Sequence, residues 1–228
     1  RGLSIFGNTT GLNVASGIST FQAVTGTTGT FSADSTFNSI SIGKGANSVA
    51  GNTVLGESAL DAAVTGGSNT AIGKQSLTAN TSGASNTALG KDALESNSTG
   101  SQNTAVGANA LAANTTANNN TAVGTNALED NTTGDQNTAV GRDALEANTT
   151  AAGNSAFGYN TLASNTTGTR NTAVGSLALD AITTTNDNTA IGYAALSAST
   201  TGQNNTAVGR SALATSTTGS NNTAVGRL

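Results

Sequence analysis

A pentapeptide of the form Asn-Thr-Ala-Val-Gly recurs between Asn52 and Gly226, and each of its eleven copies begins 17 residues after the one before. The spacing contains no insertion or deletion. A short and constant period predicts a solenoid, in which each repeat forms one coil stacked on the last. We number the positions of a repeat from 1 to 17, beginning at the Asn.

The repeat holds two apolar positions with large side chains. Position 4 is always apolar, position 5 is always Gly, and position 9 is Leu in every complete repeat. Because successive side chains of a strand point to opposite faces, we expect position 4 to turn inward and meet position 9. The predicted core residues of the central coils are Val106, Val123, Val140, Leu111, Leu128 and Leu145.

Small residues occupy the opposite face of the predicted strand. Ala at position 3 and Gly at position 5 permit another backbone to approach closely. The predicted close-packing face of the central coils consists of Ala105, Gly107, Ala122, Gly124, Ala139 and Gly141.

Two large inward residues make a thin core. Burial contributes about 25 cal/mol per Å² of apolar surface, whereas ordering the backbone of one coil costs on the order of 17–34 kcal/mol. We therefore expect burial against identical neighbours. The predicted fold is all-β, a parallel β-solenoid whose chains form a parallel homotrimer, intertwined or side by side, and so a fibre.

Positions 12 to 15 commonly read Asn-Thr-Thr-Gly, which is typical of a turn. Stacked turns predict ladders of Asn and Thr side chains. The same residues create N-glycosylation motifs, which we interpret as ladder residues; they begin at Asn8, Asn80, Asn97, Asn114, Asn131, Asn148 and Asn165. One alternative remains within the repeat, because Asp-Ala-Leu-Glu-Ala at 143–147 has helix propensity and could form a single helical turn.

Charged residues avoid the predicted strand. Basic residues such as Lys74 and Arg142 occupy position 6, and acids such as Glu129 and Glu146 occupy position 10. We expect both positions to be exposed corners that can form surface ion pairs, each contributing little to stability.

The composition argues against catalysis, metal binding and nucleic-acid binding by this chain. It has no Cys and no His, and its net charge is −4. Catalysis needs positioned acids, bases or nucleophiles, and nucleic-acid binding needs a basic stripe. We expect no enzyme activity, cofactor, metal site, nucleic-acid partner or membrane insertion. Ice binding by the Thr columns and calcium binding by scattered Asp residues are the weaker alternatives.

Two regions differ in pattern. Residues 1–51 lie outside the period and predict an irregular β neck, ending in a first coil of different length at 41–51. Residues 52–228 predict a shaft of ten full repeats and a partial eleventh. The chain stops within a repeat, so we interpret it as a fragment of something longer.

The motifs NSVAGNTVLG (47–56) and NTAIG (69–73) resemble the head repeats of trimeric autotransporter adhesins, which are β-rolls with somewhat shorter coils. The longer pattern NTAVGxxALxxNTTG is similar to repeats of bacteriophage tail fibres, and residues 17–45 resemble the linker before such repeats. The resemblance implies the shaft of a phage tail fibre, located in the virion, with host glycan or protein binding at a tip outside this segment. The alternative is a bacterial or archaeal surface adhesin or extracellular filament of the same architecture.

Overall fold

The computed structural model describes residues 35–37 and 40–227. Two strands, β1 (Ser35–Phe37) and β2 (Ile40–Gly43), precede a short 3-10 helix, η1 (Ala46–Ser48). The remaining strands each begin at position 2 of a repeat: β3 (Thr53–Gly56), β4 (Thr70–Ile72), β5 (Thr87–Leu89), β6 (Thr104–Val106), β7 (Thr121–Val123), β8 (Thr138–Val140), β9 (Ser155–Phe157), β10 (Thr172–Val174), β11 (Thr189–Ile191), β12 (Thr206–Val208) and β13 (Thr223–Val225).

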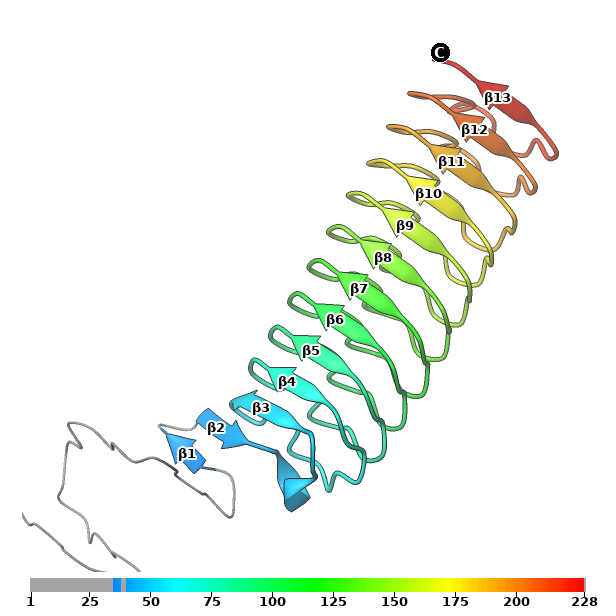
Figure 1. Ribbon diagram of the computed structural model, residues 1–228. Helices are drawn as coiled ribbons and strands as arrows, with labels where there is room; N and C mark the ends of the chain where they lie inside the picture. The colour runs from blue at the N-terminus through cyan, green and yellow to red at the C-terminus, as the bar shows by residue number, and fades with distance from the viewer. Residues whose placement is uncertain (1–34, 38–39, 228) are drawn as a thin grey trace, which may run out of the picture. The chain divides into compact units, whose positions relative to one another are not determined.

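Strands β3 to β13 form one parallel sheet in sequence order (Figure 1). The register advances by one repeat at each step, so that Thr121 pairs with Thr138 and Val123 pairs with Val140. Each repeat is therefore one coil, and the predicted parallel β-solenoid of 17-residue coils is confirmed.

The rest of each coil is built from tight turns. Positions 7, 9 and 17 adopt positive φ; Asp143 has φ 57° and Leu145 has φ 53°. An α-helical turn requires negative φ throughout. The alternative of a helical turn at 143–147 is therefore wrong, and apart from η1 the described residues contain no helix.

The two faces of the strand are the reverse of the prediction. Ala105, Ala122 and Ala139 point inward and are fully buried. Val106, Val123 and Val140 lie on the outer surface and are half-buried, so they are not core residues. The outer face of this strand was predicted to carry the small residues, and it carries the large ones.

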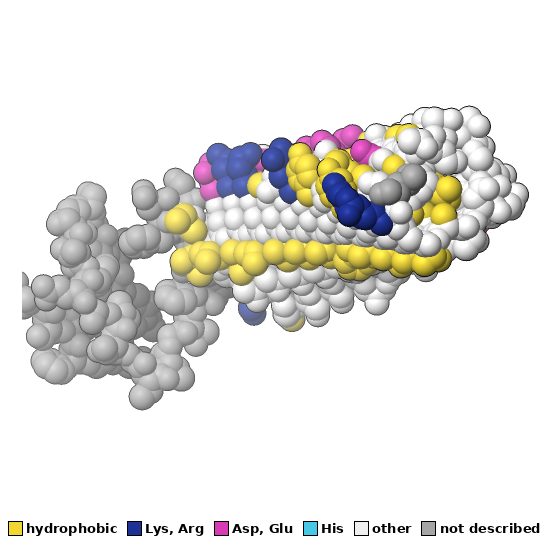
Figure 2. All heavy atoms as spheres, turned by 90° about the horizontal axis from the view of Figure 1, so that it is seen from above, with side chains coloured by type: hydrophobic (Ala, Val, Ile, Leu, Met, Phe, Trp, Pro, Cys, Tyr) yellow, Lys and Arg dark blue, Asp and Glu magenta, His cyan; other side chains and the backbone are white. Residues whose placement is uncertain are grey.

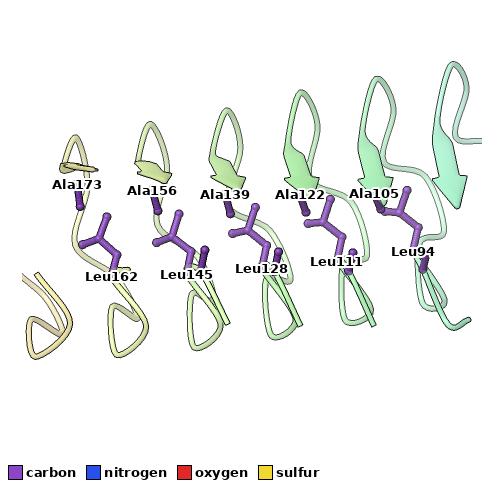
Figure 3. Packing of buried hydrophobic residues seen from close by; sticks show 14 of the residues in the cluster. Leu94, Ala105, Leu111, Ala122, Leu128, Ala139, Leu145, Ala156, Leu162 and Ala173 are labelled. Carbon is purple, nitrogen blue, oxygen red and sulfur yellow. The ribbon is translucent and has the colours of Figure 1, made fainter. Parts of the chain in front are cut away.

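The reason for this reversal is the narrow cross-section of the coil. Leu111, Leu128 and Leu145 are fully buried, as predicted. In Figure 3 these leucines extend across the coil toward the alanines of the strands. A close-packed interior already spanned by Leu accepts only a small residue opposite it. Ala and Leu thus fill the interior together, and Val must face outward.

Gly at position 5 does permit a close backbone approach, but the approaching backbone belongs to the next coil of the same chain. Gly107, Gly124 and Gly141 have φ near 138°. A Cβ at Gly124 would lie 2.4 Å from the carbonyl oxygen of Gly141. These residues therefore set the spacing of the coils within one chain.

Two columns of Asn complete the interior. At position 1, the Asn120 side-chain oxygen accepts the backbone N–H of Asn137 at 2.8 Å, and its amide donates to the carbonyl of Gly134 at 2.9 Å. At position 12, the amide of Asn131 donates to the side-chain oxygen of Asn114 at 3.1 Å. All these Asn side chains are fully buried. The Asn ladder predicted at the turn is confirmed at position 12, and the column at position 1 is a further ladder that was not predicted. Both satisfy polar groups that burial would otherwise penalise.

The first coil has a cover. Strand β2 pairs with β3 in the antiparallel direction, aligning Ile42 with Leu55. The backbone N–H of Ala46 donates to the carbonyl of Leu60 at 3.1 Å, and the Asn47 amide donates to that of Val64 at 2.9 Å. This segment closes the edge of the solenoid. The segment is not the first coil expected at 41–51, because the strand of a coil would pair with β3 in the parallel direction. Most of the predicted neck, residues 1–34, lies outside the described residues.

Candidate functional site

A continuous line of apolar side chains runs along the outer face of the sheet (Figure 2). We call it the apolar stripe, and it comprises the position-4 residues Leu55, Ile72, Leu89, Val106, Val123, Val140, Phe157, Val174, Ile191, Val208 and Val225. Several of them are strongly exposed, including Leu89 at 44% and Phe157 at 40%. Sequence reasoning found this column and placed it on the wrong side of the strand.

The stripe is regular because the strands are in register. Each position-4 residue pairs with the position-4 residue of the next coil, as Val106 does with Val123. A column of Thr at position 2, which includes Thr104 and Thr121, faces outward beside it and is half-buried in these coils. Val, Ile, Phe and Thr all suit a pleated, partly exposed surface. The outer face therefore carries one apolar column and one hydroxyl column.

A second line of side chains, at position 6, follows the corner next to the sheet. We call it the position-6 row, and it comprises Glu57, Lys74, Lys91, Ala108, Thr125, Arg142, Tyr159, Ser176, Tyr193, Arg210 and Arg227. All except Ser176 are exposed, as predicted. In Figure 2 charged and apolar side chains form a line parallel to the apolar stripe.

The predicted pairing between positions 6 and 10 does not occur among the described residues. Lys74 pairs with Glu57 of the same row at 3.2 Å. Arg142 pairs with the adjacent Asp143 at 3.0 Å, and Lys91 pairs with Asp92. Position 10 is instead half-buried in every complete coil except the first. Glu95 and Glu129 at this position accept hydrogen bonds from position 7 of the preceding coil, from Gln75 at 3.1 Å and from Asn109 at 3.4 Å.

The acids at position 10 are perturbed by this placement. Burial, reinforced by nearby carboxylates, raises the pKa of Glu129 and of Glu146. Burial also raises the pKa of Asp180. Within residues 35–37 and 40–227, no three His, Cys, Asp or Glu side chains come together in a way that could hold a metal ion.

The predicted glycosylation motifs occupy the inner ladders. Asn80, Asn97, Asn114, Asn131 and Asn148 are fully buried, and so is Asn165. Their amides donate within the solenoid, so the folded coil does not offer them to a modifying enzyme. The motif at Asn8 lies outside the described residues.

Comparison with protein-family models, curated proteins and solved structures finds no match to the chain. In the part of the chain that the structure describes, no helix is long and apolar enough to cross a membrane. The features that bear on function are therefore the apolar stripe and the position-6 row.

Proposed function

We propose that this chain is the shaft of a homotrimeric fibre, and specifically of a phage tail fibre that projects a host-binding tip. The observation that carries the proposal is the apolar stripe. It extends over the eleven strands β3 to β13, about 48 Å at the spacing of adjacent strands. Contiguous apolar surface of this extent is typical of a surface that binds a partner.

The partner that best fits the stripe is another copy of the same chain. A parallel neighbour carries the same residues at the same spacing, so each layer of one stripe meets the equivalent layer of the other. The Thr column beside the stripe supplies a polar border, as interfaces commonly have. A continuous line of matching layers favours a parallel, in-register assembly.

Three copies around an axis parallel to the stack would direct all three stripes to that axis. This arrangement replaces the Ala and Gly interface that the sequence predicts, because those residues are occupied within each coil. It also removes the apolar stripe from water along its whole length. The assignment to a phage tail fibre rests on the resemblance of the repeat and of residues 17–45 to such fibres.

Sedimentation equilibrium tests the assembly. The protein is expected to sediment at about three times its chain mass of 22.0 kDa. The double variant Val123→Lys, Val140→Lys places charges in the stripe and is expected to release folded single chains. Thr116→Lys, at an exposed turn position, is the matched control and is expected to retain the trimer.

A wild-type protein that sediments as a single folded chain would refute the assembly, as would a double variant that remains trimeric. The phage assignment is tested separately, with an antibody raised against the chain. We expect the full-length protein to purify with virions and to be labelled on their fibres. Recovery in a cell-envelope fraction without virions would overturn that assignment.

A further inference from the structure

Five consecutive members of the position-6 row form a symmetric series: Arg142, Tyr159, Ser176, Tyr193 and Arg210. The guanidinium carbon of Arg142 lies 5.8 Å from the ring centre of Tyr159, and that of Arg210 lies 5.7 Å from the ring centre of Tyr193. The two tyrosine residues are 46% and 49% exposed. The series therefore has a cation at each end, two exposed rings inside them and a small residue at the centre.

The centre of the series is a gap between two rings. Tyr159 and Tyr193 are two coils apart, a separation of about 9.6 Å from strand spacing. Each arginine comes from the coil on the far side of its tyrosine, so it covers the ring face turned away from the other ring. The faces turned toward Ser176 have no aromatic or cationic partner among the described residues.

We propose that Tyr159, Ser176 and Tyr193 form a clamp that binds one sugar ring of an acidic polysaccharide. The separation of the rings selects the shape of the guest. Carbon atoms pack best at about 3.5–4.0 Å, so a flat aromatic base would fill only ~7–8 Å between two rings. A pyranose in its chair form is thicker, because its C–H groups project above and below the ring. It contacts both tyrosines where a nucleobase would contact one.

The tyrosines also supply polar tips. A tyrosine ring offers an apolar face for sugar C–H groups, and its hydroxyl can donate to or accept from sugar hydroxyls. Ser176, at the floor of the gap, adds a third hydroxyl. These groups suit a ligand that is apolar on its ring faces and polar around its edge.

The arginines select for negative charge. Arg142 is already paired with Asp143 at 3.0 Å. Arg210 has no ion-pair partner among the described residues. A guanidinium binds carboxylate or sulfate in a bidentate fashion. Arg210, on the far face of Tyr193, is therefore the group that binds an acidic substituent of a further sugar, where the polysaccharide leaves the gap at its open edge and passes over the tip of Tyr193.

This binding site goes beyond the proposed shaft and does not depend on it. The shaft rests on the apolar stripe, whereas the clamp rests on the position-6 row. Binding and chain mass are therefore measured on the same samples, and one proposal can fail while the other stands.

Tyrosine fluorescence is a direct assay, because the whole chain contains two Tyr and no Trp. The emission therefore reports on the clamp alone. We would titrate the protein with a hexamer of β-1,4-linked glucuronic acid, whose equatorial linkages leave both ring faces free, and with the same hexamer after methyl esterification of its carboxylates. The acid hexamer is expected to change the emission saturably. The ester, which keeps the ring and loses the charge, is expected to bind about tenfold or more weakly.

Three variants locate the site, and calorimetry provides a second measure of affinity. Ser176→Leu fills the gap and is expected to abolish binding, while Arg210→Gln is expected to weaken it about tenfold or more. Lys91→Gln, in the same row but five coils from Ser176, is the control and is expected to bind as wild type. Circular dichroism and chain mass establish that each variant is folded and assembled.

The proposal is overturned by any of three results. The first is an emission that does not respond to the acid hexamer at millimolar concentration. The second is a Ser176→Leu protein that is folded and still binds. The third is tighter binding of a single-stranded DNA hexamer than of the glucuronate hexamer, which would identify the rings as a base-stacking surface.

Discussion

Substitution of Ala122 by valine tests which face of the strand lies inside the coil. Ala122 is fully buried and pairs with Ala105 and Ala139 in the adjacent coils. Two added methyl groups would therefore enter a close-packed interior with no free side. Such overpacking costs about 1–3 kcal/mol. The upper part of this range is expected here, because the neighbouring alanines are held in place by strand pairing on both sides.

The matched control is Thr121→Val, which introduces the same residue one position earlier. Thr121 is half-buried on the outer face, so its near-isosteric replacement is expected to change stability by less than about 0.5 kcal/mol. Both free energies come from urea unfolding followed by circular dichroism at one protein concentration. If Ala122→Val is no more destabilising than Thr121→Val, then Ala122 does not point into the interior and the assignment of faces is wrong.

Four further predictions concern the interior and the corner. Leu128→Ala leaves a cavity in a fully buried column and is expected to cost about 3–5 kcal/mol in urea unfolding; a cost below that of an ordinary surface substitution would contradict the core. Gly124→Ala would set a Cβ 2.4 Å from a backbone carbonyl at a φ of 140° and is expected to lower the thermal midpoint strongly. Gly134→Ala is its control. A Cβ there would also lie close to a backbone carbonyl, 2.1 Å from the oxygen of Ala151, but Gly134 lies outside the positive-φ region and the sequence has Ala at this position in two other coils, so the smaller effect is expected. Asn120→Ala removes the acceptor of one backbone N–H and the donor to one carbonyl, and is expected to cost about 1–3 kcal/mol and to speed amide exchange in the adjoining coils. Burial and neighbouring carboxylates raise the pKa of Glu146 in the folded state, so the folded protein binds this proton more tightly than the unfolded chain does. Lowering the pH from 7 through the folded pKa therefore increases the free energy of unfolding. The increase is complete below the pKa of Glu in the unfolded chain, about 4.3. The thermal midpoint is therefore expected to rise on acidification to pH 5, and to rise less in Glu146→Gln; an equal rise in both proteins would refute this role.

Much of the fold follows from residue spacing alone. The period of 17 residues specifies the coil, and each strand begins at position 2 of its repeat as the motif predicts. Leu at position 9 lies in a turn and not in a strand, so the alternation of strand side chains does not direct it outward. Its large apolar side chain fills the interior, as predicted. The Asn ladder at position 12 was also predictable, since identical turns stack in register and their side chains can bond from coil to coil. The burial of the Asn column at position 1 was not predicted.

The candidate sites were not predictable to the same degree. A strand that alternates Thr, Ala and Val presents two possible inner faces, and hydrophobicity alone favours Val. The choice depends on what fills the opposite wall, which the sequence of one strand does not contain. The pairing of Tyr159 with Arg142 likewise required the register, because these residues are neighbours only after stacking.

By itself, the sequence determined that this chain is a solenoid of equal coils, with Gly at position 5 of every repeat and Leu at position 9 of every complete one. These features are local or periodic, so they are visible without any knowledge of contacts. Only the tertiary structure decided that Ala faces in and Val faces out, because that choice is made by the width of the closed coil. The same closure turned a predicted core column into an exposed apolar stripe, and it placed two tyrosines on either side of a serine.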